Sequence, residues 1–166
     1  MAGADLREVS GLADIALLRL HRPAPSDAAF ANRRIDLPPV GSEVAALHYP
    51  GGKPQAFCDG RIAEHIQCDW LGICPENQAL GELPHFLTAF WRQGSTEDGS
   101  SGSGLFDAKG QLIGILHGGA SHAPGWSGPD DYGWIGLAFG SARRYPMSTI
   151  LAGQRQLSWP VNVVVL

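Results

Sequence analysis

The sequence has little that would point to a nucleic acid or a membrane as its partner. Its 166 residues carry a formal net charge of -4, and only 17% of them are charged, so attraction to a polyanion or to an anionic lipid surface is not expected. No apolar run reaches the length of a membrane span. The N-terminus also lacks the basic head, apolar run and small-residue cleavage site of a secretory signal. We therefore expect a soluble chain with no nucleic-acid or membrane partner.

Cysteine is scarce, and its spacing excludes the usual zinc sites. The three cysteines, Cys58, Cys68 and Cys74, lie within a span of seventeen residues and match no zinc-binding pattern. One disulfide with one remaining free thiol is the expectation. The sequence predicts no metal site and no cofactor, and the cysteines do not indicate a compartment.

Glycine and proline, in contrast, are plentiful. The chain has 22 glycines and 12 prolines, and short apolar runs lie between them within a composition that is 44% hydrophobic. A chain of this size suits one domain with a real core. Many turns between short apolar segments favour an all-β fold over a helical bundle. We divide the chain into residues 1–39, a strand and a proline-rich connection, and residues 40–166, the main body.

A glycine-rich loop at residues 97–104 is the most informative segment. A nucleophilic serine needs an exposed hydroxyl and a backbone that curls so that amide N–H groups converge beside it. Gly99 and Gly102 would allow that curl, with the amides of Gly99 and Ser101 as the donor pair and the Ser101 hydroxyl as the nucleophile. Taken alone, the loop also fits a solvated turn or a flexible linker. The strand-turn-strand pattern that follows, ending in His117-Gly118-Gly119, favours the catalytic reading because it predicts a hairpin.

The segment Gly99-Ser100-Ser101-Gly102-Ser103, with the hairpin and His117-Gly118-Gly119 after it, resembles the active-serine region of trypsin-like (chymotrypsin-fold) serine proteases. Within that superfamily it is most similar to bacterial lysyl endopeptidases, over about residues 91–122. The resemblance implies that Ser101 is the nucleophile and that Gly99 and Ser101 form the oxyanion hole. Ser100 stands where trypsin has an aspartate that pairs with a newly formed N-terminus, so activation through that salt bridge is not expected.

A second segment, residues 11–20, reads as a buried strand with one carboxylate, Asp14, near its start. A lone aspartate at a strand end is commonly a solvated cap. In the resembled family an Asp-hydrophobic-small-Leu-Leu pattern carries the aspartate of the catalytic triad, which orients a histidine and stabilises its imidazolium. Asp14 matches that position. It precedes Ser101 by 87 residues, in the chymotrypsin order of His, Asp and Ser.

The resemblance also implies how a peptide substrate is bound. His117, Gly118 and Gly119 match the strand beside the substrate backbone, and Asp130 matches the aspartate at the base of the lysine-binding pocket. Two solvated acids in a turn, Asp130 and Asp131, are the alternative. Glu97 and Asp98 are rival anchors for a basic side chain, because the position of trypsin's pocket aspartate is here the neutral Ser95. Cleavage after lysine or another basic residue is the expectation.

The catalytic histidine has no counterpart where the family places it. In this family it lies upstream of the aspartate, inside an N-terminal β-barrel, but all six histidines here follow Asp14. We interpret His48 as structural, because it lies between Asp14 and Ser101. A serine without a base keeps its proton, so we expect the chain by itself to be a poor catalyst, with the histidine supplied by a missing segment or another chain. The resemblance implies a secreted or periplasmic bacterial protein.

The predicted architecture is a six-stranded antiparallel β-barrel over about residues 40–138, with Asp14 on a strand outside it and a short helix near residues 141–151. Three functions compete. The first is a trypsin-like serine endopeptidase represented by its C-terminal part, and the second is a non-catalytic pseudo-protease or peptide-binding module. The third, an α/β hydrolase, fails because Ser103 replaces the final glycine of its Gly-x-Ser-x-Gly motif and no histidine follows Asp130.

Overall fold

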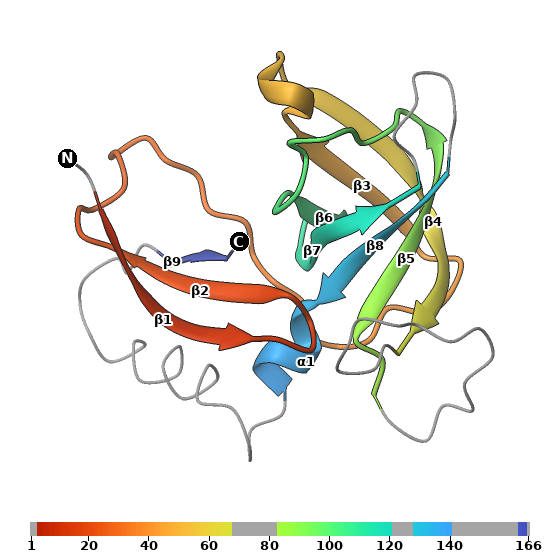
Figure 1. Cartoon of the computed structure of the whole chain (residues 1–166), viewed down its shortest axis with the longest axis horizontal. Coiled ribbons are helices and arrows are strands. Elements are labelled where there is room, and N and C mark those ends of the chain that lie inside the picture. Colours follow the sequence, from red (N-terminus) through yellow and green to blue (C-terminus); the bar gives the residue numbers. More distant parts are fainter. Residues whose placement is uncertain (1–2, 68–82, 121–127, 141–162, 166) are drawn as a thin grey trace.

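The computed structural model describes residues 3–67, 83–120, 128–140 and 163–165. The described residues form two sheets and one short α-helix (Figure 1). The elements in chain order are β1 (Ala4–Ser10), β2 (Ile15–Leu20), β3 (Glu43–His48), the 3-10 turn η1 (Pro50–Gly52), β4 (Ala56–Ile66), β5 (Phe86–Gln93), β6 (Gly104–Asp107), β7 (Leu112–Gly119), β8 (Pro129–Trp134), α1 (Ile135–Gly140) and β9 (Val163–Val165).

Six strands close into a barrel in the order β3-β4-β5-β8-β7-β6, and each neighbouring pair is antiparallel. The prediction of an all-β, six-stranded antiparallel barrel is therefore confirmed, and the strands span 43–134 within the expected range of 40–138. Closure leaves the barrel without a free sheet edge. The serine loop at residues 97–104 connects β5 to β6 at one end of this barrel.

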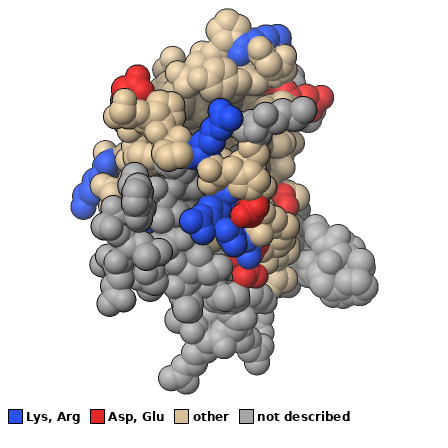
Figure 2. Space-filling view, turned by 90° about the vertical axis from the view of Figure 1, so that its left-hand side faces the viewer, with Lys and Arg blue, Asp and Glu red and all other residues tan. Residues whose placement is uncertain are grey.

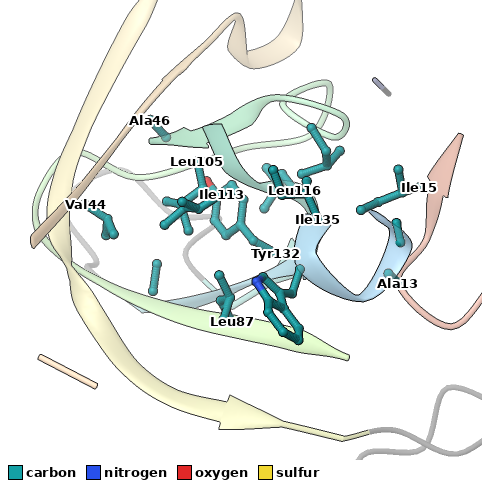
Figure 3. Close-up of a cluster of buried hydrophobic side chains, with 14 of the residues drawn as sticks. Ala13, Ile15, Val44, Ala46, Leu87, Leu105, Ile113, Leu116, Tyr132 and Ile135 are labelled. Atoms are coloured by element: carbon teal, nitrogen blue, oxygen red, sulfur yellow. The ribbon is translucent and has the colours of Figure 1, made fainter. Parts of the chain in front are cut away.

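The barrel interior is filled by alternate residues of its strands. Along β3, the inward positions are Val44, Ala46 and His48, all at most 2% exposed. The same period of two buries Leu87, Ala89 and Trp91 on β5. Figure 3 shows the Tyr132 ring lying between Ile113 and Leu87 inside the barrel. The alternation matters for function because it places His48 among apolar side chains.

The hairpin predicted after the serine loop is present as β6 and β7. Its turn is fixed by Asp107, whose Oδ1 accepts hydrogen bonds from the amides of Lys109 and Gln111, each 2.9 Å away. Gly110 has φ of 70°, a left-handed conformation that suits glycine. The hairpin places His117, Gly118 and Gly119 at the end of β7, beside β8.

Strands β1, β2 and β9 form a separate three-stranded sheet in which β2 is central. Figure 1 shows this sheet beside the barrel, with α1 between the base of the barrel and β2. The turn from β1 to β2 brings Ala13 and Ile15, both at most 1% exposed, into the main core. Figure 3 shows these two side chains near Ile135 and Leu116. The turn that carries Asp14 is thereby packed against the barrel.

Gly133 on β8 makes this packing possible. A Cβ atom at position 133 would overlap the backbone carbonyl of Ala13. We expect Gly133→Ala to lower the free energy of unfolding by about 3 kcal/mol, because an added methyl in a packed site forces the backbone apart. Chemical denaturation measures the change, and Gly118→Ala on β7 is the matched control, since its Cβ would meet nothing within 4 Å. Equal stability of the two variants would contradict the proposed contact.

Some boundaries differ from the sequence prediction. The strand expected at residues 11–20 begins only at Ile15, so Asp14 lies in the turn before β2 and not on a strand. The last strand of the barrel ends at Trp134, and residues 135–140 form α1, in which Leu137, Ala138 and Phe139 are buried. The helix expected at residues 141–151 lies outside the described residues. Near the C-terminus, the described residues form β9.

The remaining sequence expectations concern cysteine and charge. Cys58 is a free, buried thiol, whereas Cys68 and Cys74 lie outside the described residues. Among the described residues, no helix is both long and apolar enough to cross a membrane. On the face drawn in Figure 2, basic and acidic side chains are interspersed among other residues.

Candidate active site

The serine loop curls as predicted at its two glycines. Gly99 and Gly102 have φ of 87° and 81°, a region that disfavours side chains. The Ser100 amide donates to the carbonyl of Glu97 (3.0 Å), and the Ser103 amide donates to the carbonyl of Ser100 (3.1 Å). Because of these two turns, the neighbouring residues Ser100 and Ser101 differ in exposure. Ser101 is exposed, whereas Ser100 is 1% exposed.

The amides of the predicted oxyanion hole have no acceptor in the described part of the chain. The amide of Gly102 donates to the carbonyl of Leu116 (2.9 Å), and those of Ser100 and Ser103 are bound as above. Gly99 and Ser101 make no such bond with any described residue. Two free N–H groups beside an exposed serine hydroxyl are what a developing oxyanion requires.

Asp14 stands in a strained turn and faces a histidine. Its φ of 49° makes it the only described non-glycine residue with a left-handed backbone, and such strain tends to occur at functional sites. Its Oδ2 lies 2.7 Å from Nδ1 of His117, and both side chains are more than half exposed. The structure therefore pairs the predicted triad aspartate with a residue that the sequence assigned to substrate binding.

One cavity joins these residues. It measures about 190 Å³ and is lined by nine residues of β1, β2 and the turn between them, the serine loop and β7, namely Val9, Asp14, Ile15, Ala16, Ser101, Gly102, Ile115, Leu116 and His117. Asp14, in the turn before β2, and Ser101, in the loop between β5 and β6, thus line the same cavity. The sequence predicted this convergence through the family resemblance alone.

No described side chain forms a hydrogen bond with the Ser101 hydroxyl. Of the five described histidines, His21 pairs with Asp5, His48 with Ser100, His65 with the carbonyl of Pro38, and His117 with Asp14. His85 is 8% exposed and lies next to β5. The general base therefore has no counterpart among the described residues in contact with Ser101.

Asp130 is placed inside the barrel wall, where it is 1% exposed. Its Oδ2 accepts hydrogen bonds from Nε1 of Trp91 (2.6 Å) and from Oγ1 of Thr96 (2.8 Å). It lies directly beside Gly119, where a Cβ atom would overlap its Oδ1. The reading of Asp130 as one of two solvated acids in a turn is therefore wrong, because this carboxylate is buried and hydrogen-bonded.

The rival anchors for a basic substrate side chain lie elsewhere. Glu97 accepts a hydrogen bond from Nζ of Lys53 at 3.0 Å, and its side chain is 28% exposed. Asp98 is exposed, and its carbonyl accepts from the Gly51 amide at 2.7 Å. Neither side chain lines the cavity that Asp14 and Ser101 share.

A buried contact between His48 and Ser100 is the feature that sequence reasoning missed. Nδ1 of His48 lies 2.8 Å from Oγ of Ser100, and Nε2 lies 3.3 Å from Sγ of Cys58. The Ser100 hydroxyl also accepts a hydrogen bond from the Glu97 amide at 3.2 Å. The signal was present in the sequence, because the alternation of β3 places His48 on the inward face after Val44 and Ala46.

Burial dominates the electrostatics of this interior. It lowers the pKa of His48, so the imidazole is neutral at pH 7. It also raises the pKa of Cys58 to about 12 and raises that of Tyr132, and the negative charge of Asp130 raises both further. Burial raises the pKa of Asp131 as well, although its hydrogen bond from Thr88 opposes the shift. Charge in this barrel is therefore costly unless it is hydrogen-bonded, as it is at Asp130.

Comparison with known proteins identifies the fold and the family. No curated protein matches the chain, but several solved proteases share its fold. The inactive form of Rv3671c from M. tuberculosis H37Rv is 21% identical, with a TM-score of 0.57 over 92% of this chain. The HtrA-type protease AlgW, bound to a decapeptide, is 24% identical with a TM-score of 0.56 over 81%. The MamO protease domain from Magnetospirillum magneticum is 17% identical with a TM-score of 0.51 over 81%.

These likenesses show the fold, which is that of trypsin-like serine proteases. The chain spans 67%, 38% and 64%, respectively, of the three proteins it matches. A family model described as "Lysyl endopeptidase, C-terminal domain" matches residues 1–133, a range that includes Asp14, the serine loop and Asp130. The chain therefore belongs to the family of lysyl endopeptidase C-terminal domains.

Proposed function

We propose that this chain is the C-terminal part of a serine endopeptidase that hydrolyses peptide bonds after lysine or another basic residue through an acyl-enzyme. One observation carries the proposal. The Asp14 carboxylate and the exposed Ser101 hydroxyl line one cavity, and the amides of Gly99 and Ser101 donate no hydrogen bond to any described residue. A serine with a preorganised pair of donors and a nearby carboxylate fits acyl transfer.

The chemistry assigns a role to each group. Ser101 Oγ attacks the carbonyl carbon of the scissile bond, and the Gly99 and Ser101 amides stabilise the oxyanion. A histidine supplied from outside this chain accepts the serine proton and gives it to the leaving amine, after which water releases the acyl group. Asp14 would hold that histidine, in place of its present partner His117.

Substrate recognition follows from β7 and β8. The backbone of His117, Gly118 and Gly119 would form strand-like hydrogen bonds with the substrate residues that precede the scissile bond. Asp130, beside Gly119, would receive the lysine ammonium, and Trp91 and Thr96 hold its carboxylate in place. The partners proposed are a peptide or protein substrate and a histidine-bearing N-terminal segment, in a secreted or periplasmic setting.

A non-catalytic peptide-binding module is the second candidate. One observation favours it, namely that no described histidine is hydrogen-bonded to the Ser101 hydroxyl. Such a module would keep the cavity and the barrel but would not hydrolyse peptide bonds. The two functions differ in whether Ser101 becomes a nucleophile once a base is supplied.

The test uses a fusion in which the N-terminal, histidine-bearing barrel of a bacterial lysyl endopeptidase precedes residue 1. We refer to it as the barrel fusion. A fluorophosphonate is expected to label one serine, identified as Ser101 by peptide mapping, and Ser101→Ala should abolish labelling. Ser103→Ala is the matched control and should retain it, because Ser103 is only two residues away. A folded fusion that binds peptides but is never labelled would support the non-catalytic module instead.

A further inference from the structure

The serine loop contacts β3 and the segment after it through groups that have no role in the proposed mechanism. The loop's backbone rests on the segment after β3, since the Gly51 amide donates to the carbonyl of Asp98 at 2.7 Å. The Gly99 backbone lies so close that a Cβ there would come within 3.1 Å of the Gly51 nitrogen. These contacts support the outer part of the loop. The inner part depends on a side chain, that of Ser100.

We propose that His48 is a positioning residue for the oxyanion hole, acting through Ser100, an inference that rests on the proposed function. Ser100 separates the two donor residues, so the place of its Cα sets the direction of both amides. Its hydroxyl, 1% exposed, lies 2.8 Å from His48 Nδ1 and accepts from the Glu97 amide at 3.2 Å. The loop is thus tied to β3 by one buried side-chain contact.

The imidazole suits this task because both its nitrogens have partners. With the proton on Nε2, the ring donates toward Sγ of Cys58 at 3.3 Å and accepts the Ser100 hydroxyl proton on Nδ1. Ser100 then satisfies its donor and one acceptor site at once. Because burial lowers the pKa of His48 and so favours its neutral form, the contact with Ser100 is a neutral hydrogen bond and not an ion pair.

The contact can be removed while the bulk of the side chain is kept. His48→Asn retains a hydrogen-bonding atom near the place of Nδ1, within reach of Ser100. His48→Gln extends its amide toward the place of Nε2 and Cys58, and leaves Ser100 without its partner. The two variants therefore differ in the contact proposed to matter. Ser100→Ala removes the same contact from the other side without leaving an unpaired hydroxyl.

The first test uses the 166-residue chain and needs no activity. In amide spectra, His48→Gln and Ser100→Ala are expected to shift the Gly99 and Ser101 resonances. They should also speed the hydrogen exchange of the Ser100 and Ser103 amides, which are hydrogen-bonded within the loop, by about tenfold or more, because the loop loses its inner support. His48→Asn should stay close to the unsubstituted chain. The core amides of Leu87 and Ile113 are the internal control and should not change in any variant. Unmoved Gly99 and Ser101 amides in a folded His48→Gln chain would overturn the proposal.

The second test measures kcat and KM of the barrel fusion. Deleting an oxyanion donor costs about 10²–10³-fold in kcat. We therefore expect misplacing both donors in His48→Gln to lower kcat by at least about tenfold. KM should change little, and His48→Asn should restore kcat. Equal kcat in the Gln and Asn variants would contradict positioning by Nδ1. If the unsubstituted fusion is inactive, the proposed function fails, and the amide spectra still decide whether His48 positions the loop.

Discussion

Replacing Asp130 by asparagine in the barrel fusion is expected to lower the ratio of kcat/KM for lysyl over leucyl substrates by on the order of a hundredfold. A lysine ammonium that enters the barrel loses its hydration, and removing the carboxylate that receives it leaves a buried, unpaired charge. The leucyl substrate has no such charge, so its kcat/KM should change far less. Paired lysyl and leucyl esters measure the ratio directly.

The substitution Asp130→Asn removes the negative charge and keeps the size of the side chain. Asparagine keeps one oxygen that can accept from Trp91 Nε1 and Thr96 Oγ1, which both donate to Asp130. Asp131→Asn is the matched control, because Asp131 is adjacent on β8 and binds Thr88 at 2.7 Å. An unchanged ratio in Asp130→Asn would exclude Asp130 as the lysine anchor. Loss of lysine preference on changing Glu97 or Asp98 instead would move the pocket to the serine loop.

The sequence predicts the barrel well because its signals are local. The alternation of β3 and the turn residues Asp107 and Gly110 each fix a structure within a few residues. The serine loop is predictable for the same reason, since Gly99 and Gly102 stand where the backbone turns left-handed. Local patterns do not fix the point at which one element ends and the next begins. The apolar run Ile135-Gly136-Leu137 fits a strand or a helix, and packing on the barrel decides for α1.

Contacts between distant segments are what the sequence cannot supply without a relative. Nothing near Asp14 shows that its partner lies 103 residues further on, at His117. Asp130 gives no local sign of burial, because Trp91 and Thr96 come from a different part of the chain. His48 was assigned a structural place by its order in the chain alone, and its contact with Ser100 spans 52 residues. The resemblance supplied the first two roles but not the third.

The second large effect expected is on the nucleophile itself. In the chain alone, a fluorophosphonate should label Ser101 slowly, and joining the histidine-bearing barrel should raise the labelling rate by about 10²–10⁴-fold, the usual contribution of a general base. The reason is geometric: no described side chain is hydrogen-bonded to the Ser101 hydroxyl, and Asp14 is occupied by His117 at 2.7 Å. Time courses of labelling at equal concentration give both rates.

His117 is the residue that could make this expectation fail. It already binds Asp14 through Nδ1 and lines the same cavity as Ser101, so a turn of its ring toward the serine would give the chain a base of its own. His117→Ala in the chain alone decides between the two cases. Slow labelling that this substitution leaves unchanged means that the base must come from elsewhere. Fast labelling that it abolishes means that Asp14, His117 and Ser101 work together, and that a second histidine would have to displace His117 from Asp14 before the barrel fusion gained anything.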